Sequence, residues 1–307
     1  DMSFSNLTQV SDANPQQSEY NWGTAELVNW ISLDGKELQG MLIKPENFDP
    51  NKKYPMIVNF YEKSSDGLFS HRPPTAGRST ISYSFYTSRG YVIFNPDVHY
   101  RIGYPGESAY NSVIPGITSL IEEGFIDKEN IGVQGHSWGG YQTSFILTQT
   151  DMFRCIVTGA PPTNLESFYN NIYGSSGTVH HGIMEIGQVR MGRDVTPWTH
   201  REDYQRENPM HHVPNIRTPF MILHGTDDGA VDWSQGLELF NAARRNGKEV
   251  IFLSYPKEGH HLANEANQKD FQRRMKAYFD HYLMDKPAPK WMIDGVPHLE
   301  KQYERAD

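Results

Sequence analysis

The residue types and spacing best suited to chemistry occur at residues 135–140, which read Gly-His-Ser-Trp-Gly-Gly. A Gly-x-Ser-x-Gly pattern between a strand and a helix forms a sharp turn that lifts the serine hydroxyl out of the sheet. Glycines are needed there because a Cβ two positions away on either side would collide with the strand or the helix. The amide of Trp138 would point to where an oxyanion forms, and the helix N-terminus would add a favourable dipole. The pattern therefore predicts nucleophilic catalysis by Ser137.

A serine hydroxyl needs a base to take its proton, and after this kind of turn an acid and then a histidine follow along the chain. The adjacent carboxylates Asp227 and Asp228 follow the apolar run 220–224, and the adjacent imidazoles His260 and His261 follow the next apolar run. If both runs are parallel strands, their loops meet at the same edge of the sheet as the serine. Because adjacent side chains diverge, only one carboxylate and one imidazole are expected to take part in the triad. The spacing alone does not show which member of each pair it is.

Short apolar runs alternate with helix-compatible stretches from residue 55 onward. The apolar runs lie at 55–61, 91–95, 131–134, 155–158, 220–224 and 250–255. The helix-compatible stretches lie at roughly 78–88, 113–123, 139–150, 165–173, 234–246 and 266–283. This alternation predicts βαβ units, and with the serine turn it indicates an α/β-hydrolase fold: a mostly parallel central sheet with helices on both faces.

Four local features refine this pattern. The step Asp34-Gly35 between two apolar runs predicts a β-hairpin over 27–43. Pro115 is expected to start its helix, because proline is favoured in the first turn. Gly247 is expected to end the fifth helix in a left-handed conformation. Residues 174–214 show no clean period, and they form either an insertion that covers the site or two irregular helices.

The charge and composition of the chain exclude several classes of function. Its 28 basic and 37 acidic residues give a formal net charge of −9, which argues against nucleic acid as a partner. No run of about 18 apolar residues occurs and the first twenty residues do not resemble a signal peptide, so we expect a soluble chain without a membrane span. The sequence does not identify the cellular compartment, and the full-length protein could be extracytoplasmic. The oligomeric state, a homo-oligomer included, is open as well.

Cofactors and disulfides are not expected. Cys155 is the only cysteine, so no intramolecular disulfide forms, and its apolar surroundings indicate a buried, inert thiol. The pairs His180-His181 and His211-His212 lack the i, i+4 spacing and the carboxylate partner of common metal sites. No glycine-rich phosphate-binding motif occurs either. We therefore expect neither a metal nor an organic cofactor.

Three motifs follow one another along the chain. They are Gly-His-Ser-Trp-Gly-Gly-Tyr at 135–141, His-Gly-x-x-Asp-x-x-Val at 224–231 and Tyr-Pro-x-x-Gly-His at 255–260. Together they resemble the prolyl oligopeptidase family of serine peptidases, and most closely its dipeptidyl-peptidase IV and acylaminoacyl-peptidase branches. The resemblance implies Ser137 as the nucleophile, Asp228 as the acid and His260 as the base. It leaves Asp227 and His261 as neighbours of the catalytic groups.

The resemblance also implies an oxyanion hole. This hole would combine the Trp138 amide with the hydroxyl of Tyr61, at the end of an early strand. The family often continues Tyr-Gly-Gly-Pro, whereas this chain has Glu62-Lys63-Ser64 after the tyrosine. The hydroxyl of Tyr61 is therefore expected in the site, within a loop that departs from the family's sequence.

For the acyl side of the substrate, the resemblance implies an apolar slot that would suit a proline-like or small apolar residue. Its walls would be Trp138, Pro162, Phe168 and Val231. At the position of Ala230 the dipeptidyl-peptidase branch carries an asparagine that binds the substrate carbonyl. Dipeptidyl specificity is therefore not implied.

The resemblance covers about residues 24–284, which it implies are an α/β-hydrolase catalytic domain. Residues 1–23 would be a hinge and the remnant of a preceding β-propeller, and residues 285–307 an extended C-terminal tail. Family members normally carry such a propeller, which restricts access to peptides, and 307 residues are too few to contain it. We therefore expect an excised or processed catalytic domain whose full-length protein includes an N-terminal β-propeller.

The expected function is hydrolysis of peptide bonds in short peptides, through a Ser-Asp-His triad and an acyl-enzyme. A peptide substrate is therefore the expected partner. The triad alone does not distinguish an amide from an ester, so an esterase acting on small acyl esters is the alternative enzyme. A catalytically silent excised domain is the alternative outside catalysis.

Overall fold

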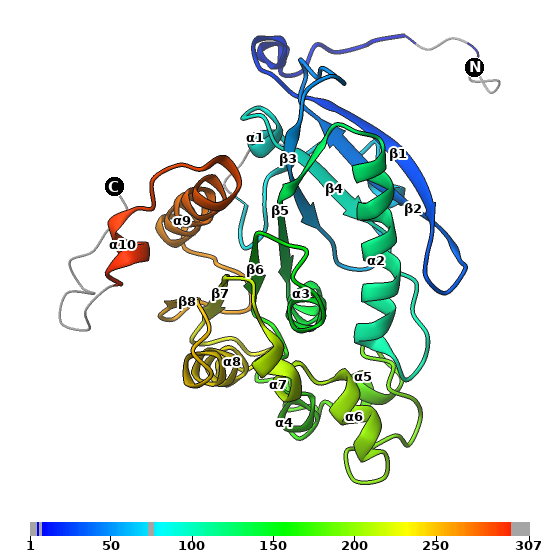
Figure 1. The fold of residues 1–307 in the computed structure, drawn as a ribbon, viewed down its shortest axis with the longest axis vertical. Coiled ribbons are helices and arrows are strands. Elements are labelled where there is room, and N and C mark those ends of the chain that lie inside the picture. The colour runs from blue at the N-terminus through cyan, green and yellow to red at the C-terminus, as the bar shows by residue number, and fades with distance from the viewer. Residues whose placement is uncertain (1–4, 6–7, 73–76, 296–307) are drawn as a thin grey trace.

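A central sheet of eight strands organises the computed structural model, which describes residue 5 and residues 8–72 and 77–295 (Figure 1). The strands are β1 (Thr24–Ile31), β2 (Glu37–Lys44), β3 (Tyr54–Asn59), β4 (Val92–Pro96), β5 (Ile126–His136), β6 (Cys155–Gly159), β7 (Phe220–Gly225) and β8 (Val250–Tyr255). Their order across the sheet is β1-β2-β4-β3-β5-β6-β7-β8. The β1–β2 and β2–β4 pairings are antiparallel and the other pairings are parallel. The prediction of a mostly parallel sheet is confirmed.

Helices cover both faces of this sheet (Figure 1). They are α1 (Tyr83–Thr87), α2 (Pro105–Glu122), α3 (Trp138–Gln149), α4 (Leu165–Tyr169), α5 (His181–Glu185), α6 (Arg201–Glu207), α7 (Pro209–His212), α8 (Trp233–Arg245), α9 (Glu265–Met284) and α10 (Lys290–Ile293), with 3₁₀ segments η1 (Pro15–Glu19), η2 (Ser65–Gly67) and η3 (Val213–Asn215). One face packs against α2, α3 and α8, and the other against α1 and α9. In β3, Met56 and Val58 belong to the first core and Ile57 to the second, because successive side chains of a strand point to opposite faces. The predicted α/β-hydrolase fold is confirmed.

Helix α2 begins at Pro105, so the prediction that Pro115 starts it is wrong. A proline inside a helix leaves the carbonyl four residues earlier without its usual donor. Here that carbonyl, on Asn111, accepts a hydrogen bond of 3.0 Å from the amide of Leu33. The loop between β1 and β2 therefore supplies the donor that Pro115 lacks, and the helix continues through the proline.

Several smaller expectations can be compared with the structure. The hairpin and the left-handed Gly247 are confirmed, with φ of 72° at Gly35 and 66° at Gly247. The tail is not extended throughout, because its described part contains α10. Trp291 of α10 contacts α9, and the centroid of its ring lies 5.0 Å from the Arg274 guanidinium. Residues 296–307 and most of residues 1–7, which belong to the expected tail and hinge, lie outside the described part. Within that part, no helix combines the length and apolar character that crossing a membrane requires.

The aperiodic residues 174–214 form three short helices, α5, α6 and α7, followed by η3. A buried apolar cluster joins this segment to α3 and α4. Its members include Trp138, Tyr141, Leu165, Phe168, Tyr169, Met184, Val189, Met191 and Tyr204. Because Trp138 directly follows the candidate nucleophile, the segment is both irregularly helical and packed beside the site.

Candidate active site

The turn that holds Ser137 has the predicted strand–turn–helix context, between the end of β5 and the start of α3. Ser137 has φ of 61° and ψ of −121°, a conformation that costs a residue with a side chain about 1–3 kcal/mol and is common at functional sites. A Cβ on Gly135 would lie 2.2 Å from the Gly139 carbonyl oxygen, and one on Gly139 would lie 2.5 Å from that of Phe60. Gly135 is therefore required by the turn itself, and Gly139 by its close packing against Phe60, the residue after β3.

His260 lies between the serine and an aspartate. Its Nε2 is 2.8 Å from Ser137 Oγ, and its Nδ1 is 2.8 Å from Asp228 Oδ2. Asp228 is on the loop after β7 and His260 on the loop after β8, so parallel strands deliver all three groups to one edge of the sheet. The structure brings these three residues together.

The two neighbouring candidates point elsewhere. Asp227 is exposed, and its carboxylate accepts a hydrogen bond of 2.9 Å from the hydroxyl of Thr226. The ring of His261 stacks on that of His136, with centroids 4.5 Å apart. Only Asp228 of the first pair and His260 of the second therefore form the hydrogen-bonded chain to Ser137.

The carboxylate of Asp228 is fully buried and richly hydrogen-bonded. Burial alone would raise its pKa, but hydrogen bonds from His224 and His260 outweigh burial and hold the pKa of Asp228 well below its usual range. Its Oδ1 also accepts the amides of Ala230 and Val231, each at 2.9 Å. The group is therefore an ionised acceptor, which places the hydrogen of His260 on Nδ1 and leaves Nε2 free to accept the proton of a hydroxyl.

Tyr61 lies two residues beyond the end of β3, slightly later than the sequence suggested. Its phenol oxygen accepts a hydrogen bond of 3.0 Å from Gln188 Nε2. Tyr61 lines a cavity of about 330 Å³ together with Ser137 and His260. Trp138 provides the first N–H of α3, a position that has no acceptor within a helix. Two donors with free hydrogens are thus available next to the nucleophile.

A second, smaller cavity of about 70 Å³ also opens at Ser137. It is lined by all four residues expected in an acyl-side slot, namely Trp138, Pro162, Phe168 and Val231. The segment 174–214 contributes Ile183, Gln188 and Val189 to the same walls. The Trp138 indole is held in place because its Nε1 donates to the hydroxyl of Tyr100 at 2.9 Å. The result is a small, largely apolar recess beside the candidate nucleophile.

Residues 81–286 match the sequence model of the prolyl oligopeptidase family. The chain belongs to the prolyl oligopeptidase family. That family consists of serine peptidases, and the resemblance inferred from the three motifs is confirmed.

Curated relatives agree with this membership, and a solved structure shares the fold. The chain is 25% identical over 300 residues to the uncharacterized peptidase YuxL of Bacillus subtilis, covering 90% of this chain and 42% of that protein. It is 24% identical over 266 residues to dipeptidyl-peptidase 5 of Schizosaccharomyces pombe, covering 82% and 36%. An acylaminoacyl peptidase bound to Z-Gly-Gly-Phe-chloromethyl ketone shares the fold, with a TM-score of 0.74, 19% identity and coverage of 97% of this chain and 47% of that one. The chain thus spans less than half the length of these proteins.

Three residues at this prolyl oligopeptidase-family site had no role assigned from the sequence. His224 Nε2 lies 3.4 Å from Asp228 Oδ2. The sequence could have indicated its role, because His224 opens the second motif, four residues before Asp228. Tyr100 and Gln188 touch Trp138 and Tyr61, but they come from segments without a motif. Their roles depend on contacts between distant parts of the chain.

Within the part of the chain that the structure describes, three imidazoles near the nucleophile form the candidate group for a metal centre. The ring nitrogens of His136, His260 and His261 lie within 4.8 Å of one another. Tetrahedral zinc would need them about 3.4 Å apart, given Zn–N bonds of about 2.0–2.1 Å. Both nitrogens of His260 already face Ser137 and Asp228. As placed, these imidazoles do not fit a metal.

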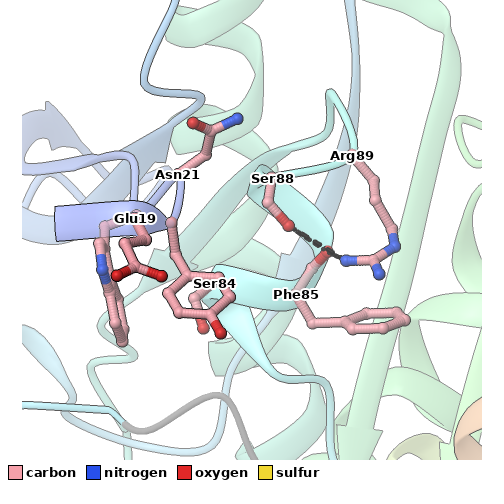
Figure 2. A pocket seen from close by; sticks show the side chains of 8 residues that line it. Glu19, Asn21, Ser84, Phe85, Ser88 and Arg89 are labelled. Carbon is pink, nitrogen blue, oxygen red and sulfur yellow. Dashed lines mark hydrogen bonds between the residues drawn. The ribbon is translucent and has the colours of Figure 1, made fainter. Parts of the chain in front are cut away.

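A larger cavity of about 780 Å³ lies away from this site, between η1 and α1. Figure 2 shows its lining, which includes Glu19, Ser84, Phe85, Ser88 and Arg89. The Arg89 guanidinium lies 3.7 Å from the centroid of the Phe85 ring and donates to the Phe85 carbonyl at 2.8 Å. No lining residue is shared with the two cavities at the nucleophile. Cavity size alone would therefore misplace the site.

Proposed function

We propose that the protein cleaves peptide bonds through an acyl-enzyme formed on Ser137. The hydrogen-bonded chain from Ser137 through His260 to Asp228 is the observation that carries this proposal. His260 Nε2 takes the hydroxyl proton while Ser137 Oγ bonds to the substrate carbonyl carbon. The imidazolium then gives that proton to the leaving amine, and the carbon–nitrogen bond breaks. Water, activated by the same imidazole, hydrolyses the resulting ester and frees Ser137.

The surrounding groups stabilise the charges that develop in these steps. The buried carboxylate of Asp228 orients the imidazole and stabilises its charged form. The Trp138 amide and the Tyr61 hydroxyl donate to the oxyanion of the tetrahedral intermediate. Both donors sit beside Ser137 before substrate arrives, so little reorganisation is needed.

The small cavity supports a substrate with a small apolar residue, such as alanine or proline, on the acyl side. Its volume of about 70 Å³ leaves no room for a large aromatic side chain without displacement of its walls. The dipeptidyl-peptidase name of one relative favours short peptides. Ala230 lines the cavity without a side-chain amide to bind the substrate carbonyl. We therefore propose short peptides, without restriction to dipeptide release.

We also propose that residues 24–284 are the catalytic unit. The sheet begins with β1 at Thr24, and the last long helix, α9, ends at Met284. The curated relatives extend well beyond the part that this chain covers, so access to the site is best studied in the full-length protein.

A fluorophosphonate probe, which reacts with activated serines, tests the nucleophile. We expect labelling of the native protein, loss of labelling in Ser137→Ala and strongly slowed labelling in Asp228→Asn. Asp227→Asn is the matched control, and it should label like the native protein because its carboxylate faces Thr226. Equal labelling of Ser137→Ala and native protein would refute the mechanism. Comparing one acyl group as anilide and as ester separates peptidase from esterase, and negligible anilide turnover would favour the esterase.

A further inference from the structure

The cavity of about 330 Å³ beside Ser137 is lined by many polar side chains, and none of them is a carboxylate. Its walls include the amides of Asn59 and Asn95, the hydroxyls of Thr80 and Tyr83, and the imidazole of His261. This lining contrasts with the apolar walls of the smaller cavity, which shares only Ser137 with it. The two cavities therefore suit different chemical groups.

The position of His260 decides which part of a substrate each cavity would receive. His260 lines the larger cavity and does not line the smaller one. In the proposed mechanism its Nε2 must reach the nitrogen of the leaving amine. The leaving part of the substrate therefore extends into the larger, polar cavity, while the acyl part occupies the smaller one.

Two arginines place positive charge next to the larger cavity. The Arg72 guanidinium lies 4.6 Å from the centroid of the Tyr83 ring. Arg78 is exposed and close to His261: burial, the neighbouring His260 and the charge of Arg78 all lower the pKa of His261. Among the described residues, neither arginine forms an ion pair with a carboxylate. Both charges are therefore available to a ligand.

Two buried carboxylates close to the cavity lining already have hydrogen-bond partners. Asp97 is buried and accepts the amides of Ser64 and Ser65, at 2.7 and 3.0 Å, together with the hydroxyl of Ser65. Asp228 is hydrogen-bonded through its Oδ2 to Nδ1 of the His260 imidazole. Hydrogen-bonding side chains thus line the cavity, and two arginines lie beside its lining residues Tyr83 and His261.

We propose that this cavity is a leaving-group subsite that selects leaving groups bearing a carboxylate. The carboxylate is either the free C-terminus of a short released fragment or an aspartate or glutamate side chain in it. Its attraction to Arg72 and Arg78 favours such substrates, while the smaller cavity selects the acyl residue independently. The subsite rests on the proposed peptidase mechanism, because it assigns the leaving side from the role of His260.

The test uses the full-length protein and peptides with a common acyl part ending in alanine. One pair has the leaving part Ala-Ala as a free acid or as an amide, and a second pair has Ala-Asp-amide or Ala-Asn-amide. We expect kcat/KM to be about two- to fivefold higher for the member with a carboxylate, the effect of a partly exposed ion pair. The first pair reports a terminal carboxylate and the second a side-chain carboxylate. The preference should shrink at high ionic strength.

Two variants assign the preference to this cavity. Arg78→Gln and Arg72→Gln should each move the carboxylate-to-neutral ratio toward one, and Arg78→Gln should fold normally because its side chain is exposed. Arg245→Gln, at the exposed end of α8, is the matched control and should keep the native ratio. A native ratio of one in both pairs, or a ratio unchanged in both variants, would overturn the subsite.

A nitroanilide of the same acyl part distinguishes this failure from failure of the mechanism. If the native protein releases nitroaniline and reacts with the fluorophosphonate probe but shows no carboxylate preference, only the subsite is wrong. If neither reaction occurs, the peptidase mechanism and the subsite are both overturned.

Discussion

The hydroxyl of Tyr61 has a single hydrogen, and the direction of that hydrogen depends on the other groups that meet the oxygen. Gln188 Nε2 donates to this oxygen at 3.0 Å and so occupies one lone pair. The hydrogen then points away from Gln188, and the cavity shared with Ser137 is open to it. Gln188 is therefore a positioning residue for the proposed oxyanion hole.

A double-mutant cycle tests this coupling between Tyr61 and Gln188. Tyr61→Phe removes an oxyanion donor and should lower kcat by about 100-fold with little change in KM. Gln188→Ala should lower kcat by about tenfold in the native background and by less than about twofold in Tyr61→Phe. The measurement is steady-state kinetics on one anilide. Equal losses in both backgrounds would show that Gln188 acts independently of Tyr61.

At the scale of elements, the segment 174–214 is tied to the loop after β3 by Arg190. Its guanidinium pairs with Glu62 at 3.0 Å and lies 4.4 Å from the centroid of the Tyr100 ring. Glu62 stands where the family often has a glycine, so this departure from the family's loop creates an anchor for the segment. Arg190 also donates a hydrogen bond to the Gln188 carbonyl, and this contact helps to position Gln188 beside Tyr61.

Removing this anchor should loosen the site without touching the nucleophile. We expect Arg190→Ala to lower kcat/KM about three- to tenfold, through loss of an ion pair and a cation–π contact. Proteolytic cleavage within 174–214 should also become faster, which limited proteolysis would detect. Arg193→Ala, an exposed arginine of the same segment, is the matched control. Similar behaviour of the two variants would contradict the role given to Arg190.

At the scale of the whole molecule, the depressed pKa of Asp228 links the site to acid stability. Its pKa is lower in the folded chain than the value of about 3.9 expected when unfolded, because hydrogen bonds from His224 and His260 outweigh burial. Asp228 therefore adds stability above about pH 4, and this contribution is lost as the pH falls through the folded pKa. Acid should weaken the fold partly through its own active site.

Chemical denaturation between pH 6 and 2 tests this link. Asp228→Asn should be less stable than the native protein at pH 6, and the difference should shrink as the pH falls below about 4. Asp227→Asn is the matched control, since its carboxylate is exposed, and its difference from native protein should stay constant. A constant difference for Asp228→Asn as well would mean that the carboxylate does not stabilise the fold through its charge.

Prediction from the sequence succeeded where the signal is local. The run 250–255 became β8 with the same bounds, because a short apolar run is a property of neighbouring residues. Prediction failed at Pro115, because the donor that lets α2 continue comes from Leu33, far away in the sequence. The spacing around 227 and 228 left two carboxylates open for the same reason, since the direction of a loop side chain depends on the strands around it.

The sequence by itself determined the fold class, the family and the placement of Ser137 in a sharp turn. Hydrophobic periodicity and turn glycines are properties of residues close together in the sequence, so these features can be recognised without a structure. The tertiary structure decided which acid meets His260, that Gln188 meets Tyr61, and that Arg72 and Arg78 flank a polar cavity. These contacts join loops that are distant in the chain, and only the packing of helices on the sheet brings such loops within hydrogen-bonding distance.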